Sequence, residues 1–326
     1  MIISRTPLRM SFAGGGSDLP GFYGQHGGAV MSTAIDKYVY VSVNKKFDNG
    51  IRVAYSKNEE VESVDQIEHR IVRATMKYLE IAGGIEIATI ADIPSKGTGL
   101  GSSSSFTVGL LHALNAYKGR YVSAAQLGAD GCHIEIEVCG EPIGKQDQYA
   151  AAFGGFNLIE FKPDGTVIVS PVICDRTTMH EIEANILVFY TGITRNASTL
   201  LEQQSREIAG SREKQRAMMR VVELAYVLRD ELHRNHASAL GEILHESWML
   251  KKSTAAGIST PEIDGWYDAA RAAGAEGGKI LGAGAGGFLM LYAPQASHEA
   301  IKSALRALRL VPMGFEPLGS RIIFYH

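Results

Sequence analysis

The chain has 326 residues, enough for one large hydrophobic core or two ordinary ones. Its 32 lysines and arginines against 35 acidic residues give a net charge of −3, and no basic cluster exceeds two adjacent residues, so the composition disfavours nucleic-acid partners. Three cysteines without metal-ligand spacing, no apolar run of membrane-spanning length and no continuous apolar stretch at the N-terminus predict a cytoplasmic protein with reduced thiols and no membrane partner.

The first part of the chain predicts alternating strands and helices. Residues 37–47 alternate in polarity and predict a strand, and the turn-forming residues 48–50 with the apolar stretch 50–56 predict a hairpin partner for it. Residues 63–84 have helical apolar spacing and end in two glycines, so they predict an amphipathic helix with a glycine C-cap. Residues 84–94 return to a strand pattern.

A glycine- and serine-rich segment, PSKGTGLGSSSSF (residues 94–106), follows that strand, and an apolar helix begins among its serines. Glycines allow close backbone approach, and a helix start offers unpaired N–H groups, so the segment can bind phosphate. It is not the common P-loop, because no Lys-Ser/Thr pair follows the last glycine. One hydroxyl is expected to cap the helix and another to reach magnesium or a phosphate oxygen. A structural loop without a ligand remains the alternative.

Two carboxylates further along the chain suggest phosphate-transfer chemistry. Residues 123–138 predict a helix with Ser123 as its N-cap and with Glu135 and Glu137 near its end. Asp147 follows in a loop between two glutamines. A helical glutamate and a loop aspartate can supply a metal ligand and a base, which kinases need. Solvated surface carboxylates are the alternative interpretation.

The second part of the chain begins between residues 170 and 185, where a proline and a polar cluster precede a fresh strand. Residues 199–273 predict mainly helices, and a second glycine-rich motif, a helix over residues 298–310 and two short strands follow. The pattern predicts an α+β protein with two domains, residues 1–180 and 181–326.

Three motifs, in order, resemble the signatures of the GHMP small-molecule kinases: TPLRMSFAGGGSD, PSKGTGLGSSSSF and KILGAGAGGFLMLY. The resemblance spans essentially the whole chain. It implies a two-domain GHMP kinase fold, with a ribosomal-protein-like N-terminal ATP-binding domain and a ferredoxin-like C-terminal domain. The N-terminal domain would contain a left-handed β-α-β unit, against the general rule for such crossovers. The active site would lie in the cleft between the domains.

The resemblance also implies roles for individual residues. Magnesium would bind Ser103 and Glu135, since Glu135 rather than Glu137 stands five residues before a loop glycine. Asp147 would orient the proton of the substrate hydroxyl, with Arg9 beside it, where a cation favours the charged carboxylate. The expected ATP-binding residues are Gly97, Gly99, Gly101, Ser102, Ser103 and Ser104.

The variants FAGGGSD and GEPIGKQDQYAAAFGGFN resemble the bacterial D-glycero-D-manno-heptose 7-phosphate kinase branch, which phosphorylates the hydroxyl at carbon 1 to give the 1,7-bisphosphate. Gly15 and Gly16 replace the Glu-His of galactokinases, which weighs against galactose. The substrate phosphate would meet Arg195 or Lys145, since cations bind phosphate. The expected substrate-binding residues are Asp18, Gly15, Gly16, Lys145, Arg195 and Gly284.

Three alternatives to this function remain. The chain could be a GHMP kinase for another sugar, of the fucose, mannose or galactose type, or for an unrelated alcohol. With any of these substrates the partners would be ATP and magnesium, and the chain could form a homodimer. It could be a catalytically silent ligand-binding regulator, although Ser103, Glu135 and Asp147 are all present. A dinucleotide-binding oxidoreductase is disfavoured, because no acidic residue follows the glycine turn at the ribose-binding distance.

Overall fold

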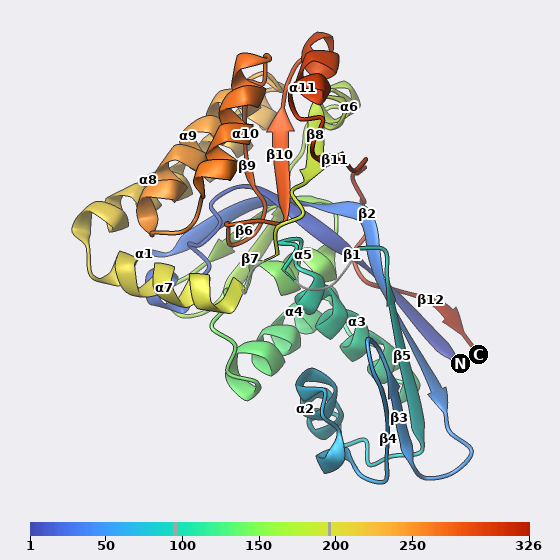
Figure 1. The fold of residues 1–326 in the computed structure, drawn as a ribbon. Coiled ribbons are helices and arrows are strands. Elements are labelled where there is room, and N and C mark those ends of the chain that lie inside the picture. Colours follow the sequence, from blue (N-terminus) through green and yellow to red (C-terminus); the bar gives the residue numbers. More distant parts are fainter. Residues whose placement is uncertain (94–96, 195–196) are drawn as a thin grey trace.

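The computed structural model describes residues 1–93, 97–194 and 197–326 (Figure 1). Its strands form two sheets. The first sheet contains β1 (Ile2–Ala13), β2 (Gly28–Lys45), β3 (Ile51–Ala54), β4 (Asn58–Val61), β5 (Ile85–Ala91), β6 (Phe156–Phe161), β7 (Val167–Pro171) and β12 (Arg321–Tyr325). The second contains β8 (Ile186–Tyr190), β9 (Gly277–Ile280), β10 (Phe288–Tyr292) and β11 (Arg309–Leu310).

The helices alternate with these strands and dominate the second half of the chain, as its apolar spacing predicts. They are α1 (Pro20–His26), α2 (Arg70–Tyr78), α3 (Ser102–Tyr117), α4 (Ala124–Cys132), α5 (Gln146–Phe153), α6 (Arg176–Ala184), α7 (Ala197–Ala209), α8 (Arg212–His233), α9 (Ala239–Thr254), α10 (Pro261–Ala272) and α11 (His298–Ala304). Short 3₁₀ turns, η1 (Val64–Gln66) and η3 (Gln295–Ser297), precede α2 and α11, and a π-helix, η2 (His133–Val138), extends α4. None of the helices described is long and apolar enough to cross a membrane.

The long strand β2 is the central strand of the first sheet and pairs with β1, β5 and β6. The order of strands is β12-β1-β2-β5-β3-β4, and β6 also pairs with β2 and carries β7 on its other side. Residues 28–35 are all buried, whereas from Val39 onward only alternate residues are buried. The first half of β2 is therefore covered on both faces, and the second half leaves one face to solvent.

The predicted hairpin between residues 37–47 and 50–56 is wrong. The turn forms, since Asp48 Oδ1 accepts a hydrogen bond from Gly50 N at 2.8 Å. However, β5 lies between β2 and β3, pairing antiparallel with β2 and parallel with β3. β5 brings Ile85 and Ile87, both fully buried, into the core, and a hairpin rule that considers only neighbouring segments cannot anticipate this insertion.

The predicted helices over residues 63–84 and 298–310 are shorter in the structure. The first divides into η1 and α2, and Glu80, with φ 54°, adopts the left-handed conformation in place of a glycine cap. α11 stops at Ala304, and Leu310 pairs instead with Phe189 in the second sheet. The helix predicted over residues 123–138 begins as expected, because the Ser123 side chain accepts a hydrogen bond from Gln126 N.

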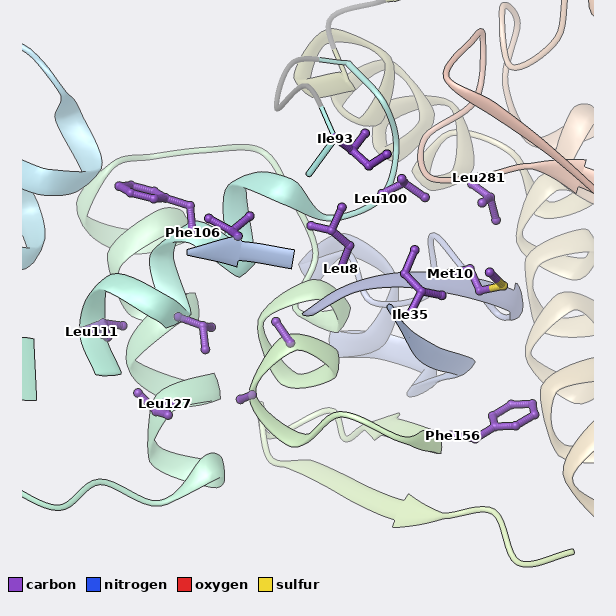
Figure 2. Packing of buried hydrophobic residues seen from close by; sticks show 14 of the residues in the cluster. Leu8, Met10, Ile35, Ile93, Leu100, Phe106, Leu111, Leu127, Phe156 and Leu281 are labelled. Atoms are coloured by element: carbon purple, nitrogen blue, oxygen red, sulfur yellow. The ribbon is translucent and has the colours of Figure 1, made fainter. Parts of the chain in front are cut away.

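The main core runs beneath the glycine-rich segments. Leu8 and Met10 of β1 pack in one cluster with Ile35, Leu100 and Leu281, and all five side chains are fully buried (Figure 2). Leu100 belongs to the first glycine-rich segment, and Leu281 to the second. The same core therefore anchors both segments beside β1.

A second core lies where α9, α10 and α11 pack against the four-stranded sheet (Figure 1). Trp248 of α9 and Tyr267 of α10 fill it against Phe189 of β8. Helix α6 connects β7 of the first sheet to β8 of the second. The last strand, β12, belongs to the first sheet again and pairs with β1. The division into domains near residue 180 remains a prediction.

Candidate active site

One cavity of about 230 Å³ brings together residues from across the chain. The cavity is lined by Arg9 of β1, by Asp18, by the N-terminal serines of α3, by Glu135 of η2 and by Asp147 of α5. Parts of α7 and α9 close it from the second half of the chain. Because the lining carries cations, carboxylates and hydroxyls, the cavity is suited to a polar, charged ligand.

The first glycine-rich segment presents the start of α3 to this cavity. Gly97, Gly99 and Gly101 all have left-handed φ values, of 69°, 74° and 75°. Gly101 is the N-cap of α3, and no described side chain caps the helix, so the predicted hydroxyl cap is wrong. Ser105 donates instead to Pro7 O at 2.8 Å, which ties α3 to β1. No described side chain therefore caps the first turn of α3, and because Ser102, Ser103 and Ser104 line the cavity, an anion there could accept hydrogen bonds from their N–H groups.

The two glycine-rich motifs pack backbone against backbone. A Cβ atom on Gly99 would lie 2.2 Å from Leu281 O, and one on Gly282 would lie 2.5 Å from Gly99 Cα. Only residues without side chains fit this contact. Gly284 is not among the cavity-lining residues, and a Cβ atom on it would instead lie 2.6 Å from Ile258 O. The second motif thus supports the first, and Gly282 rather than Gly284 reaches the cavity.

Glu135 is the buried carboxylate of the site. Ser103 Oγ donates to Glu135 Oε1 at 2.8 Å, and Gln148 Nε2 donates to Oε2 at 2.7 Å. Its side chain is fully buried, and this burial raises the pKa of Glu135, against the lowering effect of its hydrogen bonds from Ser104, Ser103 and Gln148. Glu137 points elsewhere, since its carboxylate pairs with His133 Nδ1 at 2.7 Å near the surface.

Asp147, in the first turn of α5, is held by Arg9. Arg9 Nε and Nη2 lie 2.8 and 2.6 Å from Asp147 Oδ1, and Arg9 Nη1 donates to Gly99 O at 2.6 Å. Asp147 Oδ2 faces Gly101, since a Cβ atom on that glycine would lie 3.2 Å from this oxygen. No described residue donates a hydrogen bond to Oδ2. One oxygen of Asp147 is therefore fixed by the guanidinium, and the other is available beside the start of α3.

Asp18 is a further carboxylate of the cavity lining. It accepts hydrogen bonds from Gly16 N at 3.0 Å and from Gln146 N and Nε2, each at 3.2 Å. Burial, together with the nearby charge of Asp147, raises the pKa of Asp18. Gly16 lines the cavity, whereas Gly15 lies beside Gln146 without lining it.

Of the two cations predicted to meet a substrate phosphate, only Lys145 is among the described residues, and it does not line this cavity. Lys145 is not a lining residue, and its Nζ donates to Gly165 O at 3.0 Å and lies 5.1 Å from the ring centre of Tyr23. Arg195 lies outside the residues that the structure describes.

Sequence reasoning missed several lining residues, of which Lys251 is the most notable. Lys251 stands in the last turn of α9 and is buried, with Nζ donating to Gly282 O at 2.6 Å. Gln204 of α7 and Glu141 also reach the cavity. A single lysine among the polar residues of an amphipathic helix carries no spacing signal, so only the tertiary structure reveals it.

A second hollow, of about 450 Å³, adjoins the first at Ser102 and Ser103. Its walls carry three aromatic rings, of Tyr55, His69 and Phe106. His69 lies 5.1 Å from Phe106 and 4.7 Å from Tyr55, measured between ring centres. Burial lowers the pKa of His69, which favours the neutral form of its ring. The hollow therefore offers flat aromatic surfaces next to the N-terminus of α3.

Two family models match this chain: the GHMP kinases N terminal domain over residues 67–155, and the GHMP kinases C terminal domain over residues 228–309. A relative from Campylobacter jejuni, named D-glycero-alpha-D-manno-heptose 7-phosphate kinase, is 32% identical over 94% of this chain and 93% of its own. The chain belongs to the GHMP kinase family. It is therefore an enzyme of the ATP-dependent small-molecule kinase type, as the three motifs predict.

Solved structures of other proteins share the fold of this GHMP kinase. A D-glycero-D-manno-heptose 1-phosphate kinase from Bacteroides thetaiotaomicron has a TM-score of 0.81 at 26% identity, with all of both chains covered. The galactokinase of Lactococcus lactis, solved with galactose, has a TM-score of 0.80 at 17% identity and covers 98% of this chain and 94% of its own, which shows a shared fold alone. The predicted two-domain GHMP kinase fold is confirmed.

Proposed function

We propose that this GHMP kinase transfers the γ-phosphate of ATP to the carbon 1 hydroxyl of D-glycero-D-manno-heptose 7-phosphate. The product would be the 1,7-bisphosphate, which feeds the synthesis of nucleotide-activated heptose for surface polysaccharide. The observation that carries the kinase chemistry is the free oxygen of Asp147 beside the open N-terminus of α3. The choice of heptose is supported by the Campylobacter relative, which aligns over nearly the whole chain.

ATP fits the two adjoining hollows. The aromatic hollow suits an adenine ring, since flat rings stack on bases, and it meets the phosphate loop at Ser102 and Ser103. The N–H groups of Ser102, Ser103 and Ser104 in the first turn of α3 would donate to the phosphate oxygens. The phosphates would then extend into the cavity that holds Asp147.

Proton removal would fall to Asp147. In the reaction the sugar hydroxyl oxygen bonds to the γ-phosphorus, the bond to ADP breaks, and the hydroxyl proton leaves to a carboxylate. Asp147 Oδ2 is free to receive it, while Arg9 fixes the other oxygen. Asp18 would orient the sugar by accepting hydrogen bonds from its hydroxyl groups, in place of some of its present donors.

Magnesium fits the donor set of Ser103 and Glu135. A hydroxyl and a carboxylate oxygen 2.8 Å apart are hard ligands of the kind that magnesium prefers, and the ion usually completes its shell with phosphates and water. No group of three or more His, Cys, Asp or Glu side chains suited to a metal occurs among the described residues. When bound, the ion neutralises charge on the phosphates.

A panel of sugars tests this proposal. ADP release is measured with heptose 7-phosphate, unphosphorylated heptose, fucose, mannose and galactose, and phosphorus NMR then identifies the carbon that gains the phosphate. Turnover with heptose 7-phosphate should exceed that with every other sugar, and the new phosphate should be on carbon 1. Preference for an unphosphorylated sugar would support the alternative of another GHMP sugar kinase. No turnover despite ATP binding would support a regulatory protein.

A second substrate belongs in the panel because of one comparison. The structurally similar protein from Bacteroides thetaiotaomicron carries the name of a heptose 1-phosphate kinase. If heptose 1-phosphate is phosphorylated faster than heptose 7-phosphate, carbon 1 is not the acceptor. The two substrates differ only in which end of the sugar carries the phosphate, so the comparison tests the orientation of the sugar in the cavity.

A further inference from the structure

Lys251 is a buried cation of the cavity that the proposed mechanism does not use. Its side chain comes from the last turn of α9, the residue is 4% exposed, and it lines the cavity together with Arg9 and Asp18. A buried ammonium group is unfavourable unless partners replace the water that it loses. The partners around Lys251 therefore indicate what it does.

The described residues satisfy only part of this ammonium group. Nζ donates to Gly282 O at 2.6 Å, and no described carboxylate forms an ion pair with it. An ammonium group has three donors, so two of them have no hydrogen-bond acceptor among the described residues. Arg9, the other cation among the described lining residues, is already directed at Asp147 and Gly99 O. Among the described lining residues, Lys251 is therefore the cation with N–H groups that donate to no described acceptor.

Lys251 also approaches the phosphate loop. Its acceptor Gly282 packs directly on Gly99, since a Cβ atom on Gly282 would lie 2.5 Å from Gly99 Cα. Arg9 donates to the carbonyl of the same Gly99. Arg9 therefore bonds directly to Gly99 of the loop, and Lys251 bonds to Gly282, which packs on the same glycine.

We propose that the ammonium group of Lys251 binds a phosphoryl group within this cavity. This inference rests on the proposed function, a kinase that brings together ATP and a sugar phosphate. Both ligands carry phosphoryl oxygens, so the same chemistry has two sources, the γ-phosphate of the nucleotide and the phosphate of the sugar. Hydrogen bonds between an ammonium group and phosphate oxygens are charge-assisted and among the strongest in proteins.

Binding of separate ligands tests the proposal without turnover. Lys251→Met keeps an unbranched apolar stem and removes the charge. Lys252→Met is the matched control, because Lys252 is the next residue and its Nζ instead pairs with Asp264 at 2.9 Å. Calorimetry measures dissociation constants for ADP, a non-hydrolysable ATP analogue, heptose 7-phosphate and unphosphorylated heptose.

The proposal predicts a selective loss in Lys251→Met of tenfold or more. If the γ-phosphate is the ligand, affinity falls for the ATP analogue and not for ADP. If the sugar phosphate is the ligand, affinity falls for heptose 7-phosphate and not for heptose. Lys252→Met should leave all four constants unchanged. Equal losses for phosphorylated and unphosphorylated ligands, or no loss for any ligand, would overturn the proposal and leave Lys251 as a structural cation.

The pH dependence of binding gives a second readout that requires no variant. Burial lowers the pKa of Lys251 to about 8, partly offset by Asp18, and the charges that face it are those of Asp18, Arg9, Asp147 and Lys279. Affinity of the unaltered enzyme for the responsive ligand should fall between pH 7 and pH 9, as the ammonium group loses its proton. Affinities for all four ligands that stay constant over this range would contradict the proposal.

The same experiment separates this inference from the proposed substrate. If the unaltered enzyme does not bind heptose 7-phosphate, the proposed substrate is wrong. Lys251 is then judged by the ATP analogue against ADP alone, and the absence of a difference between them would overturn its phosphoryl-binding role.

Discussion

Arg9 and Asp147 form one ion pair although 138 residues separate them in the chain, with Arg9 Nη2 2.6 Å from Asp147 Oδ1. The pair joins β1 to the first turn of α5 and fixes one carboxylate oxygen. The other oxygen is left facing the start of α3. The orientation of Asp147, the proposed base, is therefore set by a contact between β1 and α5, which are far apart in the sequence.

Asp147→Asn should fold normally and lose most of its turnover. The amide keeps the shape of the side chain and removes the charge that would receive the hydroxyl proton, a contribution of about 10²–10⁴-fold in kcat. Steady-state kinetics with the preferred sugar, together with an unfolding temperature close to that of the unaltered enzyme, would check this. Retention of more than half of kcat would show that Asp147 is not the base.

Ser103→Ala and Glu135→Gln should each raise the magnesium concentration needed for half-maximal activity and lower kcat. Each removes an oxygen ligand suited to a hard cation. Glu137→Gln is the matched control, since Glu137 lies two residues away and pairs with His133 near the surface. Magnesium titrations that do not differ between Glu135→Gln and Glu137→Gln would argue against the metal site.

Glu135→Gln should also stabilise the metal-free protein at high pH. Burial raises the pKa of Glu135, so the folded state binds this proton more tightly than the unfolded state does. The free energy of unfolding therefore falls as the pH rises above the ordinary pKa of a glutamate, because the buried carboxyl group must then ionise. Gln148 can accommodate the new amide by rotating, because its Oε1 has no partner among the described residues.

Thermal unfolding in a chelator at several pH values checks this stability effect. The unfolding temperature of Glu135→Gln should exceed that of the unaltered protein at pH 8, and the gap should narrow as the pH falls toward 5. A gap that is independent of pH would mean that ionisation of Glu135 has no part in it.

Gly99→Ala should destabilise the protein more than Gly119→Ala does. Both glycines have left-handed φ values, of 74° and 67°, so both variants carry a backbone cost of about 1–2 kcal/mol. Only at Gly99 does the new methyl group meet another backbone, 2.2 Å from Leu281 O, whereas nothing lies within 4 Å at Gly119. Urea unfolding measures both variants, and equal losses would show that the two glycine-rich motifs separate freely.

The sequence was most informative where a motif is continuous in the chain. The glycine-rich segment predicts a helix that starts among its serines, and α3 begins at Ser102. The resemblance to GHMP kinases selects Glu135 over Glu137, and the structure places Glu135 in the cavity. The roles of these residues in metal and phosphate binding remain predictions.

Features that depend on distant segments could not be predicted in this way. The insertion of β5 between β2 and β3 depends on pairing across about 40 residues, which local turn signals do not encode. Lys251 looks like an ordinary surface lysine, because its burial arises only when α9 packs beside the glycine-rich motifs. The aromatic hollow of Tyr55, His69 and Phe106 likewise assembles from three separate segments of the chain without a shared motif.

The pairing of β12 with β1 has a consequence for synthesis in the cell. Ile2 pairs with Tyr325, so one edge of β1 is synthesised more than 300 residues before the strand that pairs with it. At about 5–20 residues per second, the wait is on the order of tens of seconds. During that time β1 presents unpaired backbone groups to other nascent chains, as exposed sheet edges do. We therefore expect this edge of β1 to remain open to non-native strand pairing until β12 has been made.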